Sequence, residues 1–275
     1  MISHEFDYAK PKSLAEALEL LAGDDTKALS GGMSLIPMMK LRLAMPGTLV
    51  DLSGVPELKS IEANGTLQIG AFTTHYEVES SKLIREKCPL LVQTASQIGD
   101  VQVRNAGTIG GAVAHNDPAA DYPAALMALN AEVRLASKSG TRTMPIGEFF
   151  VDALTTALEP GEIVTHVVVP IEAAGMSTGY RKVAHPASGY AVVGIAVRVS
   201  KGDAYVGVTG LASKAFRAFK VEDALKSGAS ATEAAALVAD GVDASSDIYA
   251  SADYRKHLAR VHAGRAIAAA LAKVQ

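Results

Sequence analysis

Residues 27–41 read KALSGGMSLIPMMKL, and this stretch decides how the N-terminal part of the chain folds. Residues 27–29 predict a short strand, and residues 35–41 predict a short helix, in which Pro37 is tolerated because it lies in the first turn. The loop between them, residues 30–34, contains two glycines that let backbone N–H groups approach an anion closely. The loop therefore suits a pyrophosphate, although a glycine pair taken alone is more simply interpreted as a structural turn.

A second glycine-rich stretch lies further along the chain, where residues 104–112 read RNAGTIGGA. It precedes a predicted helix that begins near Asp121. Such a segment can wrap backbone amides around a cofactor, and Thr108 and Asn116 offer further hydrogen bonds. The alternative is a set of glycines at a bulge or a barrel corner. Neither glycine stretch matches the Walker pattern or the GxGxxG fingerprint.

The remaining patterns predict an alternation of helices and strands, and then a change of character near residue 172. We place domain boundaries near residues 55 and 172, which gives the domains 1–55, 56–172 and 173–275. The elements on which this division depends are a helix that starts at the capping sequence 13–16, a hairpin around Asn64-Gly65, a helix capped by Thr74-x-x-Glu77, a helix over 89–98, a helix over 121–129, an apolar strand over 163–169, a hairpin of 190–199 with 204–211, and a final helix over 251–274.

Composition excludes several classes of protein. Hydrophobic residues make up 49% of the 275 residues and charged residues 20%, which is typical of globular domains. A net charge of −3 gives no electrostatic reason to expect nucleic acid as a partner. No apolar run is long enough for a membrane-spanning helix. The opening MISHEFDYAK lacks the apolar segment of a secretory signal, so we expect a cytoplasmic protein.

The single cysteine, Cys88, limits the redox chemistry of the chain. One thiol cannot form an internal disulfide, a cysteine zinc site or a four-thiolate iron–sulfur cluster. The histidines at 75, 115, 166 and 185 are scattered and predict no metal site, although His115 lies close enough to the second glycine stretch to touch a cofactor. Any redox group must therefore be a bound organic cofactor.

The two glycine stretches, in this order and at this separation, resemble the FAD-binding medium subunit of molybdenum hydroxylases, the family of carbon monoxide dehydrogenase, xanthine dehydrogenase and aldehyde oxidase. The resemblance covers the whole chain, from 6–8 (FDY) through 117–123 (DPAADYP) to 181–184 (RKVA). It implies an α+β fold of the PCMH type, similar to vanillyl-alcohol oxidase. Two α/β FAD-binding subdomains would be followed by a C-terminal domain with a small antiparallel sheet and helices.

The resemblance also implies a cofactor, partners and site residues. FAD would receive electrons from the iron–sulfur clusters of a 2Fe-2S small subunit, which take them from a large subunit that carries the molybdenum cofactor. FAD would then pass them to an external acceptor. The assembly would be a dimer of heterotrimers, without nucleic acid and without a membrane span. The residues implied to bind FAD are Lys27, Leu29, Ser30, Gly31, Gly32, Met33, Ser34, Leu35, Ile98, Thr108, Ile109, Gly110, Gly111, Ala112, Asp121, Val164, Lys182 and Tyr190.

Individual roles follow from the same resemblance. Asp121 would hydrogen-bond on the ribityl or adenosine side, Ile98 and Val164 would contact the rings, and Lys182 would lie near the flavin, where a cation stabilises negative charge on the reduced ring. Tyr190 would cover the isoalloxazine, or else pack in the core of the C-terminal domain. The chain departs from the family pattern at position 33, where relatives often have a polar residue such as His or Gln.

Two other functions fit the sequence. A self-contained flavoenzyme of the vanillyl-alcohol oxidase type would need its own substrate pocket, and the roughly 100 residues after Pro170 are few for a substrate domain. A non-catalytic scaffold that has lost the cofactor would not need the glycine stretches at all. The cysteine count supports the electron-transfer subunit, because a chain with one thiol must leave the iron–sulfur clusters to another chain.

Overall fold

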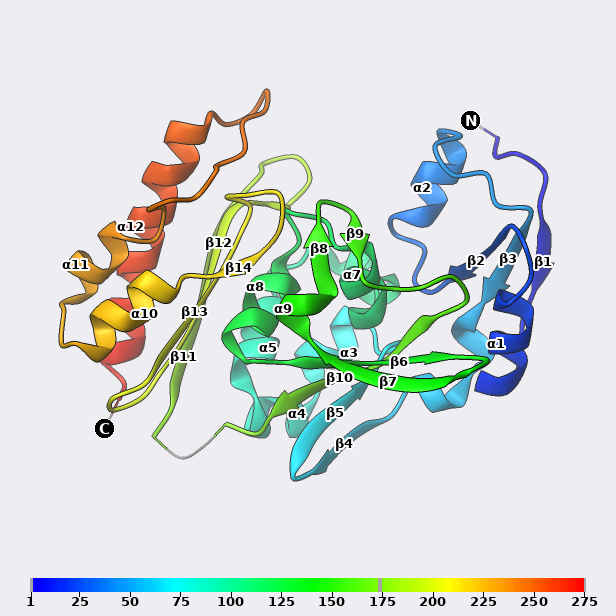
Figure 1. The fold of residues 1–275 in the computed structure, drawn as a ribbon, viewed down its shortest axis with the longest axis horizontal. Helices are drawn as coiled ribbons and strands as arrows, with labels where there is room; N and C mark the ends of the chain where they lie inside the picture. Colours follow the sequence, from blue (N-terminus) through cyan, green and yellow to red (C-terminus); the bar gives the residue numbers. More distant parts are fainter. Residues whose placement is uncertain (1, 173–174, 275) are drawn as a thin grey trace.

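The computed structural model describes residues 2–172 and 175–274, and three main sheets organise them, beside a two-stranded sheet of residues 150–152 and 155–156 (Figure 1). A parallel sheet of order β1-β3-β2 lies in the N-terminal part. A five-stranded antiparallel sheet of order β4-β5-β10-β6-β7 lies in the middle, and a four-stranded antiparallel sheet of order β11-β12-β13-β14 lies in the C-terminal part. The mixture of parallel and antiparallel sheets with separate helices confirms the expected α+β fold.

The N-terminal unit confirms the predicted strand, loop and helix around the first glycine pair. Ser13 caps the first helix by accepting a hydrogen bond from the N–H of Glu16, as its spacing predicted. The strand β1 was not predicted; it is short and pairs in parallel with β3. The elements are β1 (Asp7–Ala9), α1 (Leu14–Leu21), β2 (Thr26–Leu29), α2 (Leu35–Lys40), β3 (Thr48–Asp51), and the 3-10 turns Leu52–Gly54 and Pro56–Leu58.

The middle unit packs helices on one side of its sheet. The Asn64-Gly65 hairpin and the Thr74–Glu77 capping box are both present, as predicted. The helix expected over 89–98 is shorter and ends at Ala95. The elements are β4 (Ile61–Asn64), β5 (Thr66–Gly70), α3 (His75–Ser80), α4 (Lys82–Lys87), α5 (Pro89–Ala95), α6 (Val101–Ala106), α7 (Ile109–His115), α8 (Asp121–Ala128), β6 (Glu132–Ser137), β7 (Gly140–Pro145), α9 (Ile146–Phe149), β8 (Phe150–Asp152), β9 (Thr155–Thr156) and β10 (Ile163–Pro170).

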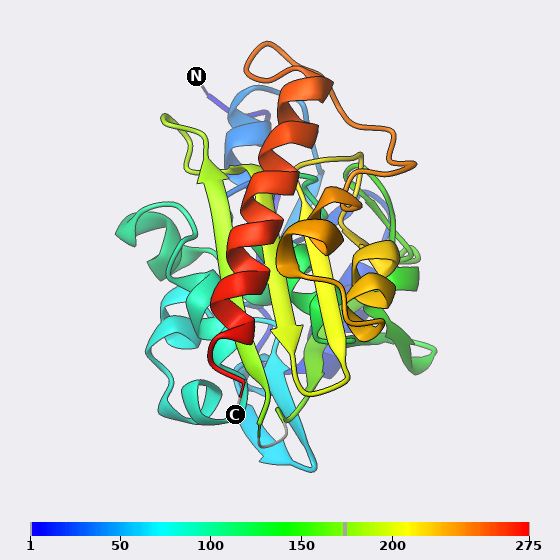
Figure 2. The same ribbon diagram turned by 90° about the vertical axis from the view of Figure 1, so that its left-hand side faces the viewer.

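The C-terminal sheet lies between helices on both faces. Figure 2 shows the long helix α12 running across one face, beside α10 and α11. The other face packs on α8, so closely that a Cβ atom at Gly207 of β13 would lie 1.9 Å from the carbonyl oxygen of Ala124. The elements are β11 (Ser177–Ala184), β12 (Ala191–Val199), β13 (Ala204–Thr209), β14 (Phe216–Arg217), α10 (Phe219–Lys226), α11 (Ala231–Ala236) and α12 (Ala252–Leu271).

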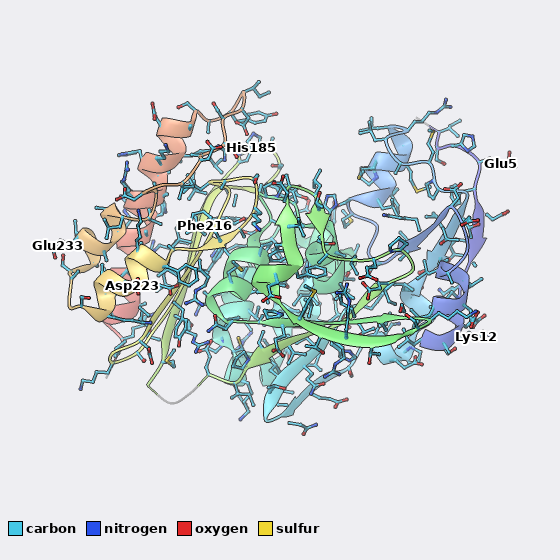
Figure 3. The ribbon with its side chains drawn as sticks, in the orientation of Figure 1. Glu5, Lys12, His185, Phe216, Asp223 and Glu233 are labelled. Carbon is cyan, nitrogen blue, oxygen red and sulfur yellow. The ribbon has the colours of Figure 1, made fainter. Side chains whose placement is uncertain are left out.

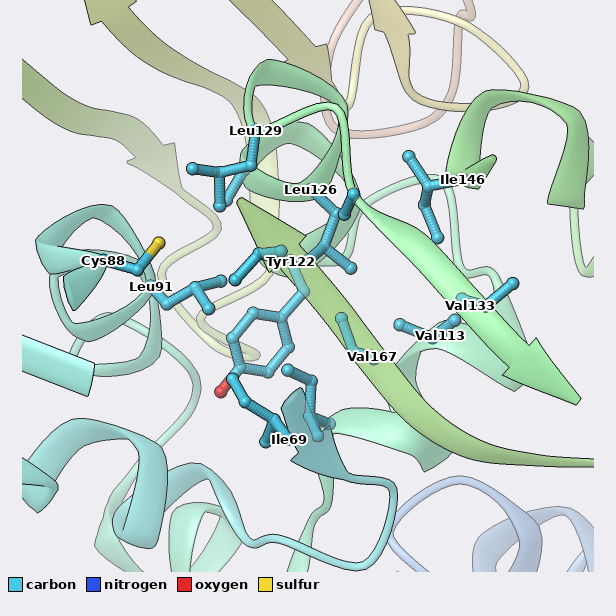
Figure 4. Packing of buried hydrophobic residues seen from close by; sticks show 14 of the residues in the cluster. Ile69, Cys88, Leu91, Val113, Tyr122, Leu126, Leu129, Val133, Ile146 and Val167 are labelled. Carbon is cyan, nitrogen blue, oxygen red and sulfur yellow. The ribbon is translucent and has the colours of Figure 1, made fainter. Parts of the chain in front are cut away.

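The largest hydrophobic core lies between the middle sheet and its helices, and Tyr122 of α8 is at its centre (Figure 4). The ring of Tyr122 is fully buried among apolar side chains that include Ile69 and Leu91. Among the described residues its hydroxyl has no hydrogen-bond partner, and burial raises its pKa. A buried hydroxyl without a partner costs stability, because it has lost its hydrogen bonds to water.

We therefore expect Tyr122→Phe to raise the free energy of unfolding by about 1 kcal/mol, since the variant removes only this hydroxyl. Urea denaturation of the full chain measures the change. Tyr180→Phe is the matched control, because the Tyr180 hydroxyl donates to Asp121 at 2.6 Å and its loss should instead destabilise the protein. Destabilisation of the Tyr122→Phe variant by as much as the control would contradict the interpretation.

The three sheets lie within the ranges 7–51, 61–170 and 177–217. We propose the division 1–55, 56–172 and 173–275 as the domains of the chain, because each range then contains one of the main sheets. Among the described helices, none combines the length and apolar character that crossing a membrane requires.

Candidate FAD-binding site

The two glycine segments, 78 residues apart in the sequence, lie against each other in the fold. The Ser30 and Thr108 hydroxyl oxygens are 2.7 Å apart and share a hydrogen bond. The backbones approach so closely that a Cβ atom at Gly31 would lie 2.0 Å from the carbonyl oxygen of Ala106 and 2.8 Å from the Cα of Gly107. Only glycine at position 31 allows this approach, so the segments form one continuous wall.

The first loop keeps its backbone donors unused. The N–H groups of residues 31–34 donate no hydrogen bond to any part of the chain that the structure describes. Gly32 has a φ of 72°, which L-residues with a Cβ adopt rarely, and this turn leads directly into α2. A run of free N–H donors on a glycine turn is the arrangement that binds phosphate oxygens.

The second glycine pair serves a different purpose from the one the sequence suggested. Residues 104–112 are not an open loop that wraps amides around a ligand, because they form the end of α6 and the first turn of α7. The N–H of Gly110 donates to Ala71 O, and the N–H of Gly111 donates to the capping hydroxyl of Thr108. A Cβ atom at Gly110 would lie 2.4 Å from the Cβ of Ala71. These glycines therefore allow close packing, and they line the site without offering free donors.

A cavity of about 780 Å³ opens beside this wall, within the usual size of a ligand site. It extends from the N-terminal unit, past both glycine segments, to the segment 188–190 of the C-terminal domain. One part of its wall is apolar and includes Leu52, Leu158 and Ile163. Another part carries Asp117, His115 and Tyr190. A cavity of this volume that combines apolar wall residues with unused backbone donors can hold a ligand with both ring systems and phosphate groups.

All but three of the predicted site residues line this cavity. Those that do are Lys27, Ser30, Gly31, Gly32, Met33, Ser34, Leu35, Ile98, Thr108, Gly110, Gly111, Ala112, Asp121, Val164 and Tyr190. Leu29 lies on β2 outside the lining, and Ile109 is fully buried in the core behind it. Met33 is 42% exposed, and its side chain presents a thioether and no polar hydrogen-bonding group.

Lys182, the third exception, forms an ion pair and does not line the cavity. Its ammonium lies 2.9 Å from Oδ1 of Asp121, and both side chains are almost fully buried. Tyr180 donates to the same carboxylate at 2.6 Å. Burial raises the pKa of Asp121, and the charge of Lys182 opposes that rise. The sequence did not show that these two predicted ligands bind each other, because the contact joins α8 to β11.

His75 belongs to the cavity wall, although the sequence suggested only an ordinary surface or core residue. It is the first residue of α3 and is 5% exposed. Its N–H donates to Gly107 O, so it supports the second glycine segment directly. Burial lowers the pKa of His75 to about 4, and the nearby charge of Arg104 lowers it further, so the imidazole is neutral at pH 7. The Thr74 cap, which fixes the start of α3, was the only local signal for its position.

Stability should depend on pH through His75. The folded state holds this imidazole neutral down to about pH 4, whereas the unfolded chain protonates it near pH 6.5. The free energy of unfolding should therefore be unaffected above pH 6.5 and should fall by up to about 3 kcal/mol between pH 6.5 and pH 4. His75→Gln should lack this part of the fall in denaturation curves measured across that range.

His4→Gln is the control for this pH dependence, because His4 is exposed near the N-terminus. It should keep the wild-type profile. A His75→Gln profile parallel to that of the wild type would contradict the assignment.

The sequence also gave no indication that the segment 158–163 lines the cavity. The only signal was the Pro160-Gly161 turn, where Gly161 has a φ of 77°. Glu162 in this segment accepts two hydrogen bonds from Arg142. No cluster of three or more potential metal-binding side chains occurs within residues 2–172 and 175–274.

The family of FAD binding domains in molybdopterin dehydrogenases matches residues 4–172, which contain both glycine segments. The chain belongs to this family. The C-terminal domain family of carbon monoxide dehydrogenase flavoproteins matches residues 178–270. The expected family and its FAD cofactor are thus confirmed.

Individual members of the family resemble the chain over nearly its whole length. The carbon monoxide dehydrogenase medium chain of Hydrogenophaga pseudoflava is 38% identical, with 99% of each chain covered. The glyceraldehyde dehydrogenase medium chain of Sulfolobus acidocaldarius is 41% identical, with 81% of each covered.

Among solved structures, carbon monoxide dehydrogenase from Hydrogenophaga pseudoflava, lacking the Mo-pyranopterin moiety, matches with a TM-score of 0.95 at 39% identity over 100% of both chains. Quinoline 2-oxidoreductase from Pseudomonas putida 86 matches with a TM-score of 0.93 at 31% identity, over 100% of this chain and 99% of that one.

Proposed function

We propose that this chain is the flavin-carrying electron-transfer subunit of a multi-subunit molybdenum hydroxylase. FAD, when bound, accepts electrons and releases them to an acceptor. The observation that carries the proposal is the wall formed by the two glycine segments, because its first loop presents free N–H donors to a cavity of about 780 Å³. The single, buried Cys88 supports a division of labour in which other chains hold the iron–sulfur clusters.

The chain's own residues would bind and orient the cofactor. Residues 31–34 would donate N–H groups to the pyrophosphate, and Lys27 would add a positive charge at the cavity wall. The apolar residues Ile98 and Val164 would contact the ring systems. Asp121 would accept a hydrogen bond from a cofactor hydroxyl, and Tyr190 would cover part of the bound flavin. The neutral His75 and the Thr108 cap would hold the wall in place.

The partners in this proposal are a large subunit with the molybdenum cofactor and a small 2Fe-2S subunit, assembled as a dimer of heterotrimers in the cytoplasm. The names of similar proteins support it, since medium chains and FAD subunits of several dehydrogenases are similar in sequence to this chain. Those dehydrogenases act on different substrates. The substrate would therefore be chosen on the large subunit.

Purification of the tagged chain from its native cells tests the assembly. We expect two further chains to copurify, one with molybdenum and one with iron and acid-labile sulfide, together with FAD. Recovery of the chain with FAD but without molybdenum or iron would contradict the subunit proposal and favour a self-contained flavoenzyme. Recovery of a folded chain that binds no flavin would contradict both and favour a scaffold.

A further inference from the structure

We propose that Lys182 is a positioning residue that holds the segment 188–190 against the segment 97–99 and so keeps Tyr190 closed over the FAD cavity. The inference rests on the proposed FAD-binding function, but it assigns Lys182 a role other than direct contact with the flavin. Both segments contribute to the cavity wall, through Ile98 and Gly99 on one side and Ser188, Gly189 and Tyr190 on the other.

The three donors of the Lys182 ammonium are all used within the protein. They reach the carbonyl oxygen of Gln97 at 2.5 Å, the carbonyl oxygen of Gly189 at 2.7 Å, and the carboxylate of Asp121 at 2.9 Å. An ammonium has three N–H groups, so this set of acceptors satisfies it. The side chain is 5% exposed, which makes each of these charge-assisted hydrogen bonds worth more than it would be in water.

Lys182 joins two segments that otherwise only touch. Gly189 packs against Gly99, where an added Cβ atom would lie 3.5 Å from the Gly99 Cα. Within the described residues, no hydrogen bond links 97–99 directly to 188–190. The ammonium of Lys182, which donates to Gln97 O and Gly189 O, is therefore the polar connection between these two segments.

The segment 185–190 is closed on itself by hydrogen bonds. His185, labelled in Figure 3, donates its backbone N–H to Tyr190 O, and its carbonyl oxygen accepts from the N–H of Gly189. Beyond the segment, the next backbone link to the FAD-binding part is the N–H of Ala191, which donates to Ala119 O. The His185 ring also packs edge-on against the Tyr249 ring, with centroids 4.3 Å apart. Loss of the Lys182 ammonium would therefore remove the anchor of this turn to residues 97–99 and let its Tyr190 end shift, while its other contacts remain.

Tyr190 is the residue that such a movement would displace. Its ring is 41% exposed, and it lines the cavity. Burial raises the pKa of Tyr190, and the hydroxyl of Ser34, near its phenol, partly offsets the rise. The side chain thus reaches from the C-terminal domain to the first glycine loop, across the cavity that both surround.

The test uses the full chain loaded with FAD and compares wild type with Lys182→Met. Removal of the ammonium should increase quenching of the flavin fluorescence by iodide and should speed FAD release about tenfold, because two hydrogen bonds that close the cavity are lost. Lys182→Met also leaves Asp121 buried without its partner, which is costly in itself. The same substitution is therefore made in an Asp121→Asn background, where no unpaired carboxylate remains.

The inference expects Lys182→Met to raise iodide quenching in both backgrounds. It further expects no additional quenching when Lys182→Met is combined with Tyr190→Ala, since the cover is then already lost. An effect confined to the background with Asp121 would overturn the inference, because the buried charge alone would explain it. Full additivity with Tyr190→Ala would overturn it as well.

If wild type binds FAD and none of the lysine variants changes quenching or release, the inference fails while the proposed function stands. Failure of wild type to bind FAD contradicts the proposed function instead.

Discussion

Gly31→Ala should lower the affinity of the chain for FAD on the order of 100-fold, which corresponds to about 3 kcal/mol. The added methyl group would lie 2.0 Å from the Ala106 carbonyl oxygen and 2.7 Å from its carbon. Both are backbone atoms of the last residue of α6, so they cannot move aside as a flexible side chain would. The two glycine segments must separate, which breaks the Ser30–Thr108 hydrogen bond and displaces the free N–H donors of the first loop.

Fluorescence titration of the apo chain with FAD measures this effect. The overall fold should persist, because Gly31 lies in a loop at the cavity and outside the three hydrophobic cores. Gly264→Ala in α12 is the matched control. A Cβ atom at Gly264 would lie 3.6 Å from the Cβ of Ala235 in α11, which is an ordinary contact distance. Wild-type FAD affinity in Gly31→Ala would mean that the close contact of the two segments is not needed for binding.

Gly207→Ala should destabilise the whole chain by about 3 kcal/mol or more. Gly207 lies where β13 crosses α8, and its added methyl group would meet the Ala124 carbonyl oxygen at 1.9 Å and the Ala128 nitrogen at 3.1 Å. The helix and the strand must move apart along a tightly packed contact. Because α8 also carries Tyr122 and Asp121, the disturbance should reach both the core and the FAD cavity.

Thermal and urea denaturation of the full chain measure the loss. Gly179→Ala tests the same substitution in β11 of the same sheet, where the nearest atom to an added Cβ is 3.9 Å away, and it should change stability little. Equal stability of the two variants would contradict the tight packing of the C-terminal sheet on α8.

Local patterns predicted the elements whose formation depends on nearby residues. The strand-loop-helix of 27–41, the Asn64-Gly65 hairpin and the Thr74–Glu77 capping box all have their deciding residues within a few positions. The resemblance then supplied the family and the cofactor. Most of the residues that it implied as FAD ligands line one cavity in the structure.

The properties that the sequence did not show arise from contacts between distant segments. The segment 104–112 looked like an open loop because glycines disfavour helices, but the Thr108 cap and the packing of Gly110 on Ala71 make its second half helical. The resemblance implied that Lys182 lies near the flavin. In the structure its ammonium instead donates to three protein acceptors, which lie on three different segments. Nothing in the local sequence around any of these residues records those contacts.

The most direct test of the central claim is a titration of the apo full-length chain with FAD and, separately, with FMN. The structure predicts saturable binding of one FAD per chain, with FMN bound much more weakly, because FMN cannot place a pyrophosphate on the first glycine loop. A folded chain that shows no saturable FAD binding, or that binds FMN as tightly as FAD, would contradict the account.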